Sequence, residues 1–212
     1  MARTIARDHE EKRALIRKRA ARVFAETGFD RASMSQLAAD CGVSKASIYH
    51  YYASKQALLF DILEQHLNAL LKRLQSIRDE EPGQRLQAML REILLAYRGA
   101  DDEHRLQINA LGQLPGDEQA RLKACQREIV ELMRQAIVDA GPVELGRDRR
   151  KLNATTMSVF GMLNWFYMWN RDDSEEARID YADLVGNLLQ GGFSGVVQAP
   201  VSLTDMPQRR SG

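Results

Sequence analysis

The sequence predicts an all-α protein, in which an N-terminal three-helix domain precedes a larger helical body, with about nine helices in all. Three observations predict this class. Apolar side chains recur at three- and four-residue steps along most of the chain. Glycine, proline and serine signals separate these stretches, and the apolar–polar alternation typical of a strand never persists. A chain of 212 residues that is 44% hydrophobic and 28% charged is expected to be globular.

Capping signals divide the N-terminal part into short helices. A serine side chain at a helix N-terminus accepts a backbone N–H, and glycine ends a helix at low cost in the left-handed conformation. Ser33 also opens a Ser-x-x-Gln capping box. Helices are predicted over about 9–27, 34–41, 45–51 and 55–74, and the signals that delimit them are, in chain order, Gly28, Ser33, Gly42, Ser44 and Ser54.

The body continues the helical pattern after a break at Pro82-Gly83. Further helices are predicted near 84–98, 102–113, 117–140, 147–171 and 174–196. The expected organisation is a DNA-binding domain over 1–55, a ligand-binding and dimerisation domain over 56–198, and a frayed, disordered tail over 199–212.

Charge is distributed unevenly although the net charge is only +1. Residues 1–55 carry 11 basic and 6 acidic side chains, a balance of +5, and the remainder carries −4. A basic end on a mildly acidic body favours local binding of a polyanion. No secretory signal or membrane-length apolar run is visible, and Cys41 and Cys125 are interpreted as free thiols, so a cytoplasmic protein without a membrane partner is expected.

The pattern over 34–51 is that of a helix-turn-helix. A short capped helix, a turn at Gly42 and a polar helix follow one another, and apolar residues on one side anchor the second helix on the first. The residues assigned to that inner face are Leu37, Ala38, Val43 and Ile48. The opposite face is then free to enter a major groove roughly 12 Å wide.

The side chains on that free face suit DNA. Lys45, Ala46 and Ser47 are small or hydrogen-bonding, and are the candidate base contacts. Tyr49, His50 and Lys55 are better placed for phosphates, which fix the register without reading sequence. The alternative is a helical protein in which this polar helix is merely solvated.

The segment from about 13 to 63 resembles the DNA-binding domain of the TetR family of transcriptional repressors. The matching residues are Ala20, Phe24, Gly28, Ser33, Leu37-Ala38, 41–45 (CGVSK), 48–52 (IYHYY), Ser54-Lys55 and Leu58-Leu59. The family usually has Phe where Tyr52 stands. The resemblance implies an all-α homodimer that binds a palindromic operator and releases it when a small molecule occupies the C-terminal domain.

Carried over by position, the resemblance adds Ser33 to the phosphate contacts. The candidate DNA-binding residues are then Ser33, Ser44, Lys45, Ala46, Ser47, Tyr49, His50 and Lys55. Ahead of this domain, Arg3 and Arg7 form a basic arm, which either reaches the adjacent DNA or is a solvated terminus.

The last two predicted helices carry more apolar surface than one domain needs. Residues 157–169 (MSVFGMLNWFYMW) are apolar almost all around a helix. The last helix presents a second apolar surface, which comprises Tyr181, Leu184, Val185, Leu188, Leu189 and Phe193. Helices near 147–171 and 174–196 are therefore expected to form a four-helix homodimer interface. A purely intramolecular core is the alternative.

Methionines and aromatics in the body suit an adaptable apolar pocket, although ordinary core is the alternative. The candidate ligand-binding residues are Met89, Ile93, Tyr97, Ile108, Leu111, Met133, Met162, Trp165 and Phe166. Residues 160–170 resemble the TetR branch that responds to acyl-CoA thioesters, including fatty-acyl and phenylacetyl-CoA. The arginines considered for a CoA phosphate at the pocket mouth are Arg98, Arg105, Arg121 and Arg127.

No motif supports an enzyme, a metal site or a cofactor. The sequence has no G-x-S-x-G elbow, Walker loop or dinucleotide fingerprint. The acidic run Asp101-Asp102-Glu103 suits the first turn of a helix better than a metal. Two hypotheses remain: a ligand-responsive repressor, or a helical small-molecule-binding or interaction protein that retains a helix-turn-helix as scaffold only.

Overall fold

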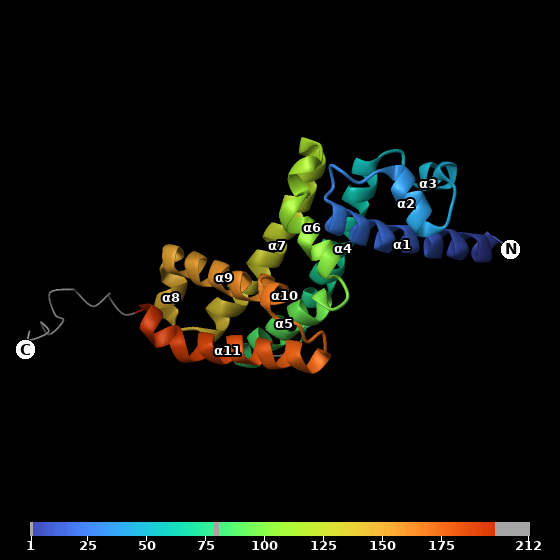
Figure 1. The fold of residues 1–212 in the computed structure, drawn as a ribbon. Coiled ribbons are helices and arrows are strands. Elements are labelled where there is room, and N and C mark those ends of the chain that lie inside the picture. Colours follow the sequence, from blue (N-terminus) through green and yellow to red (C-terminus); the bar gives the residue numbers. More distant parts are fainter. Residues whose placement is uncertain (1, 79–80, 198–212) are drawn as a thin grey trace, which may run out of the picture.

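The computed structural model describes residues 2–78 and 81–197, and all regular elements in this part are helices. They are α1 (Ala2–Thr27), α2 (Met34–Cys41), α3 (Lys45–Tyr51), α4 (Lys55–Ser76), α5 (Pro82–Tyr97), α6 (Asp101–Asn109), the 3₁₀ turn η1 (Leu111–Gln113), α7 (Gly116–Ala140), α8 (Val143–Arg147), α9 (Arg149–Asn164), α10 (Phe166–Trp169) and α11 (Glu175–Val197). In Figure 1, α1–α3 form one end of the molecule, α5 and α7–α11 the other, and α4 connects them.

The predicted capping signals are confirmed. The hydroxyl oxygens of Ser33, Ser44 and Ser54 accept the backbone N–H groups three residues ahead of them, at 3.0–3.1 Å. Gly42 ends α2 with φ +66°, in the left-handed region that glycine tolerates best. These local devices fix both ends of the turn and thereby set the direction of α3.

Three boundaries differ from the prediction. Helix α1 begins at Ala2 rather than near residue 9, because the Arg7–Glu11 and Asp8–Lys12 pairs support its first turns. The 102–113 stretch is helical only to Asn109 and then forms η1. The expected 147–171 helix is α9 and α10, and the short α8 precedes it. The predicted tail over 199–212 lies outside the described residues.

The break between α9 and α10 coincides with side chains that bond the last carbonyls of α9. The Tyr181 hydroxyl donates to the Met162 carbonyl at 3.4 Å, and His104 Nε2 lies 3.4 Å from the Asn164 carbonyl. Because neither contact is local in sequence, the apolar run over 157–169 gave no sign of the break.

A buried carboxylate fixes the helix-turn-helix on α4. The Asp61 side chain accepts a hydrogen bond from the Tyr52 hydroxyl at 2.6 Å and lies 3.1–3.2 Å from the guanidinium nitrogens of Arg13 and Arg17. Burial and the bond to Asp61 raise the pKa of Tyr52 to about 12, so its hydroxyl keeps the proton that it donates. These contacts tie α1 and the end of α3 to α4, which begins at Lys55, next to the domain boundary expected from the sequence.

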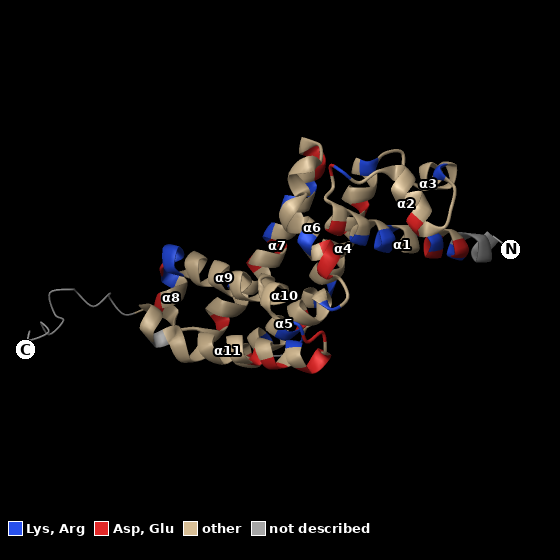
Figure 2. Cartoon of the chain, in the orientation of Figure 1, with Lys and Arg blue, Asp and Glu red and all other residues tan. Residues whose placement is uncertain are grey.

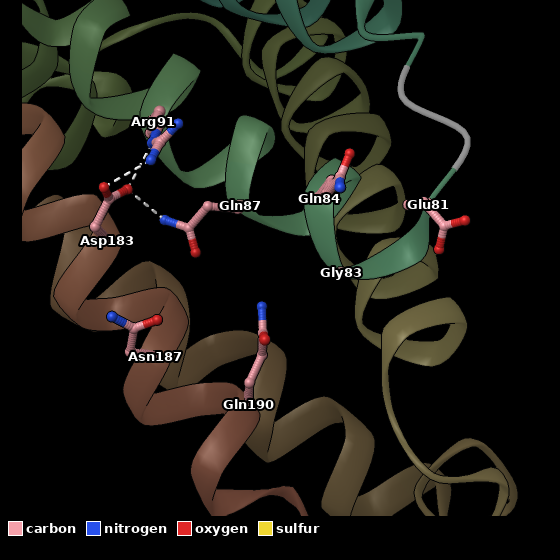
Figure 3. A pocket seen from close by; sticks show the side chains of 8 residues that line it. All are labelled: Glu81, Gly83, Gln84, Gln87, Arg91, Asp183, Asn187 and Gln190. Carbon is pink, nitrogen blue, oxygen red and sulfur yellow. Dashed lines mark hydrogen bonds and ion pairs between the residues drawn. The ribbon is translucent and has the colours of Figure 1, made fainter.

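Helices α5 and α11 are joined by an ion pair and by hydrogen bonds, which are seen in Figure 3. Arg91 pairs with both carboxylate oxygens of Asp183 at 2.5 and 2.6 Å, and Gln87 donates to Asp183 and to the Ala182 carbonyl. A side chain at Gly186 would overlap the end of the Gln87 side chain, so a larger residue at this position of α11 would displace Gln87 from its bonds to Asp183 and the Ala182 carbonyl. One face of α11 thus packs against α5, and another face is exposed, where it contacts solvent or a partner.

The centre of the body holds a cluster of polar aromatic rings. Tyr97 of α5 stacks on His104 of α6 with ring centres 4.1 Å apart, and His66 of α4 lies 5.9 Å from Tyr97. The Tyr97 hydroxyl donates to Asn164 Oδ1 of α9 at 3.0 Å. Burial lowers the pKa of both histidines to about 4. The rings therefore join four helices in an uncharged state.

Removing the Tyr52 hydroxyl is expected to destabilise the protein. Tyr52→Phe deprives the buried Asp61 carboxylate of a hydrogen bond, which should lower the free energy of unfolding by about 1–3 kcal/mol. Urea unfolding followed by circular dichroism measures this change. Tyr49→Phe, in an exposed side chain, is the matched control and should stay within about 0.5 kcal/mol. Equal stability of the two variants would contradict the assigned role of Tyr52.

Acid is expected to weaken the fold through His66 and His104. Unfolded histidines protonate near pH 6.5, whereas these two stay neutral to about pH 4 when folded. The unfolded chain therefore binds more protons between these values. The stability that comes from keeping these histidines neutral is fully present above pH 6.5. It is lost as the pH falls towards 4, by roughly 1 kcal/mol per pH unit for each histidine.

Urea unfolding at a series of pH values tests this linkage. His104→Phe should remove about half of the histidine contribution to the pH dependence, whatever its effect on stability at neutral pH. His9→Gln, in an exposed histidine, should leave the pH dependence unchanged. If the His104 variant kept the wild-type dependence of the unfolding free energy on pH, the histidine cluster would not be the cause of that dependence.

Candidate DNA-binding surface and effector cavity

One face of the short helix α3 packs against the rest of the domain, and the opposite face is exposed to solvent. Ile48 is fully buried, whereas Lys45, Ala46, Tyr49 and His50 are exposed. The Lys45 ammonium lies 5.9 Å from the Tyr49 ring centre, a cation–π distance that keeps the two side chains together. Figure 2 shows basic segments on α1 and α3 at this end of the molecule. The surface thus combines exposed positive charge with small side chains.

Two of the predicted contact residues also build the scaffold. Ser44 caps α3, and its hydroxyl lies 2.9 Å from that of Ser47. Ser33 caps α2 and is exposed at its N-terminus, a position that favours phosphate. These caps leave the hydroxyl oxygens near the surface on which DNA is expected.

Lys55 differs from its expected role as a phosphate contact. Its ammonium donates to the carbonyl oxygens of Phe29, Asp30 and Ala32, at 2.6, 3.2 and 3.0 Å. It also lies 4.4 Å from the Phe29 ring centre. Because an ammonium has three hydrogens, these contacts occupy all of them. In this structure Lys55 fixes the loop between α1 and α2.

A hollow lies beside α3, at a place that no sequence pattern indicates. It measures about 530 Å³ and is lined by Lys12, Leu15, Ile16, Cys41, Val43, Ser47, His50 and Tyr51. Val43, which was assigned to the inner face with Leu37 and Ala38, is 41% exposed here. Its backbone N–H bonds the Ala38 carbonyl at 3.0 Å, so the turn is held by backbone rather than by the valine side chain.

The body contains a partly open cavity of about 250 Å³ lined by residues of α4, α5, α6, α7 and α9. It is lined by Leu67, Leu70, Tyr97, Gln107, Gln126, Ile129, Val130, Met157, Phe160 and Asn164. The lining is apolar except for Tyr97, Gln107, Gln126 and Asn164, and none of these residues is charged. Apolar walls with a few convergent polar groups are typical of small-molecule sites.

Of the nine predicted ligand-binding residues, Tyr97 lines this cavity. Met89, Ile93 and Met133 are fully buried core, and Phe166 is buried against Tyr181. Leu111 and Met162 are half-buried, while Ile108 and Trp165 are 46% and 55% exposed. The polar lining residues were missed because a search for apolar pocket residues does not select glutamine or asparagine.

The arginines considered for a CoA phosphate do not line the cavity. Arg98 pairs with Glu175 at 2.7 Å, and Arg121 with Glu64 at 2.6 Å. Arg105 lies beside Asp102, and Arg127 is exposed on α7. A second cavity, of about 280 Å³, lies between α1, α4 and the start of α6, and includes the basic residues Arg17, Lys18 and Arg73.

The acidic run at the start of α6 makes ion pairs. Asp101 bonds the buried Arg178 at 3.1 Å, and Glu103 bonds Lys18 of α1 at 2.9 Å. Within residues 2–78 and 81–197, no cluster of histidine, cysteine and acidic residues could hold a metal. No described helix has the length and apolar character needed to cross a membrane.

Apolar side chains are exposed on α9, α10 and α11. They are Met157, Trp165, Met168, Trp169, Leu184 and Leu188, each 51–59% exposed. Large exposed apolar groups on neighbouring helices are characteristic of a surface that a partner covers.

Sequence models of two families match the chain. Residues 16–62 match "Bacterial regulatory proteins, tetR family", and residues 79–193 match "Tetracyclin repressor-like, C-terminal domain". Among curated relatives, the HTH-type transcriptional regulator YuxN of Bacillus subtilis is 27% identical over 135 residues, which is 62% of this chain and 45% of YuxN. The chain thus spans less than half the length of the first curated relatives it matches.

Solved structures match over nearly their whole length. A TetR-family transcriptional regulator from Bordetella parapertussis 12822 is 31% identical with a TM-score of 0.80, covering 88% of this chain and 98% of that one. AibR, crystallised with isovaleryl coenzyme A and operator DNA, is 28% identical with a TM-score of 0.70, covering 84% and 98%. The chain therefore belongs to the TetR family of DNA-binding transcriptional regulators.

Proposed function

We propose that the protein is a ligand-responsive repressor that binds a palindromic operator as a homodimer and releases it when a small molecule occupies the body. The observation that carries the proposal is the free face of α3. Ile48 anchors the helix from below, and Lys45, Ala46 and Ser47 lie on the side available to base edges. Tyr49, His50 and Ser33 are the proposed phosphate contacts, with Lys55 supporting them by fixing the loop after α1.

The proposed homodimer forms through α9, α10 and α11. Their exposed face contains two tryptophans, two methionines and two leucines, and Gly161, Gly191 and Gly192 on the same helices are exposed as well. Small residues among large ones allow helices of two copies to approach closely. A two-fold dimer gives two α3 helices, which fit successive major grooves when they lie about 34–36 Å apart.

The proposed effector is an acyl-CoA thioester with a short or compact acyl group. AibR binds isovaleryl coenzyme A, and the cavity of this chain is about 250 Å³. That volume lies below the roughly 300–1,000 Å³ of drug-sized sites. An acyl group of a few carbons or a phenylacetyl ring suits it, whereas a long fatty-acyl chain requires expansion.

Helix α6 is the proposed link between the cavity and the DNA-binding domain. Gln107 of α6 lines the cavity, and Glu103, one turn earlier, pairs with Lys18 of α1. The Lys18 ammonium also bonds the Gly99 carbonyl just before α6. A ligand that shifts α6 therefore changes a direct contact with α1. It controls DNA binding only to the extent that it binds the two arrangements with different affinity.

Substitutions on α3 test the DNA interface. Lys45→Ala should change the preferred base at one position of each half-site, by about 5- to 150-fold, because a base contact contributes roughly 1–3 kcal/mol of discrimination. Tyr49→Ala should instead weaken binding to all sequences alike. Selection from random DNA, followed by anisotropy titrations at several salt concentrations, measures both. Lys72→Ala, exposed on α4, is the control.

If the selected DNA is not bound more tightly than random DNA, the helix-turn-helix serves as scaffold only. A steep loss of affinity with salt is expected for true operator binding, because bound lysines and arginines release counterions from the DNA.

A charge on the exposed apolar face should abolish the dimer. Leu188→Glu places an unpaired carboxylate at the proposed interface, so light scattering after size-exclusion should give a mass near 24.0 kDa rather than twice that value. Leu15→Glu changes a leucine of similar exposure on α1 and should leave the mass unaltered. A dimeric Leu188 variant would place the interface elsewhere.

A further inference from the structure

The cavity in the body has no side chain that can neutralise an ion. Its ten lining residues are apolar, amide or phenol groups. Burial raises the pKa of the Tyr97 hydroxyl further above its usual value, so that group is uncharged as well. An ionised carboxylate or phosphate moved from water into such a site loses its hydration without gaining a counter-charge, which is strongly unfavourable.

The polar end of the cavity has an unpaired acceptor. Gln107 Oε1 is buried and has no hydrogen-bond partner, and Gln107 lines the cavity. Buried acceptors are normally bonded, and one left unpaired costs free energy that a donor recovers.

A second unpaired acceptor lies one turn away on the same helix. His104 is fully buried, and Nε2 faces the Asn164 carbonyl, which can only accept. We therefore assign the ring hydrogen to Nε2. Nδ1, which is buried without a partner, is then also an acceptor in the neutral ring. Helix α6 thus has two buried acceptors that lack donors, and of these Gln107 belongs to the cavity lining.

We infer that the part of the effector that enters this cavity is an uncharged group of a few carbons bearing an N–H or O–H, which donates to Gln107 Oε1. This inference rests on the proposal that this cavity is the effector site. It predicts selection for amides and alcohols, and rejection of the free carboxylic acid that thioester hydrolysis produces. In an acyl-CoA the acyl group itself has no N–H or O–H, so the donor is the first amide of the CoA arm, which would enter the cavity behind a short acyl group.

Three probes with one carbon skeleton separate these properties. Isovaleramide is neutral and has an N–H donor, methyl isovalerate is neutral and has none, and isovalerate is an anion. Binding to the purified full-length protein is measured by saturation-transfer NMR at neutral pH. Isovaleramide should bind at least about fivefold more tightly than methyl isovalerate, consistent with one net hydrogen bond. Isovalerate should bind at least about tenfold more weakly than isovaleramide.

A variant pair assigns the donor contact. Gln107→Leu should reduce isovaleramide affinity to that of methyl isovalerate and leave methyl isovalerate unchanged. Gln113→Leu, in an exposed glutamine of η1, should preserve the wild-type order. A melting temperature for each protein confirms that the comparison is between folded chains.

The inference is overturned if isovalerate or methyl isovalerate binds as tightly as isovaleramide, if none of the three binds, or if Gln107→Leu leaves the order unchanged. A gel shift with selected operator DNA on the same preparation separates this result from the proposed function. DNA binding without the expected probe order rejects the cavity chemistry alone. The expected order without DNA binding rejects the repressor alone.

Discussion

The buried Asp61 carboxylate is the contact on which the rest of the arrangement depends. A charge in a protein interior is tolerated only when it is paired and hydrogen-bonded, and Asp61 has Arg13, Arg17 and the Tyr52 hydroxyl around it. These partners come from α1 and from the residue after α3. The recognition helix therefore takes its orientation from α4, and any movement of α4 is carried directly to the surface that meets DNA.

Helix α4 runs between the two cavities that border the DNA-binding domain and the body. Leu70 lines both of them, and His66 lines the one next to α1. The His66 ring in turn lies near Tyr97 and His104. Leu70 and His66 both belong to α4, so a ligand that displaced Leu70 would act on α4 directly, and the ring contacts of His66 join the same helix to α5 and α6. The Lys18–Glu103 pair gives α6 a second, shorter route to α1.

Local signals made the first half of the fold predictable from sequence, and non-local contacts explain the rest. Ser33, Ser44 and Ser54 cap the helices expected of them, because a cap involves only neighbouring residues. Lys55 could not be assigned, since its carbonyl partners lie more than twenty residues earlier. The cavity could likewise not be predicted from the sequence, because Gln107 and Asn164 line it only when α6 and α9 come together in the fold.

The proposed effector cavity and the proposed dimer face share one side chain. Met157 of α9 lines the cavity and is also 51% exposed among the apolar groups on α9–α11. In the proposed dimer, a second copy packed on α9 would cover that methionine and close this wall of the cavity, which would exclude water and strengthen the hydrogen bonds inside it. If both proposals hold, the chemistry of the site and the assembly of the dimer are coupled. A ligand that pushed Met157 outwards would then act on the partner, and through it on the spacing of the two α3 helices.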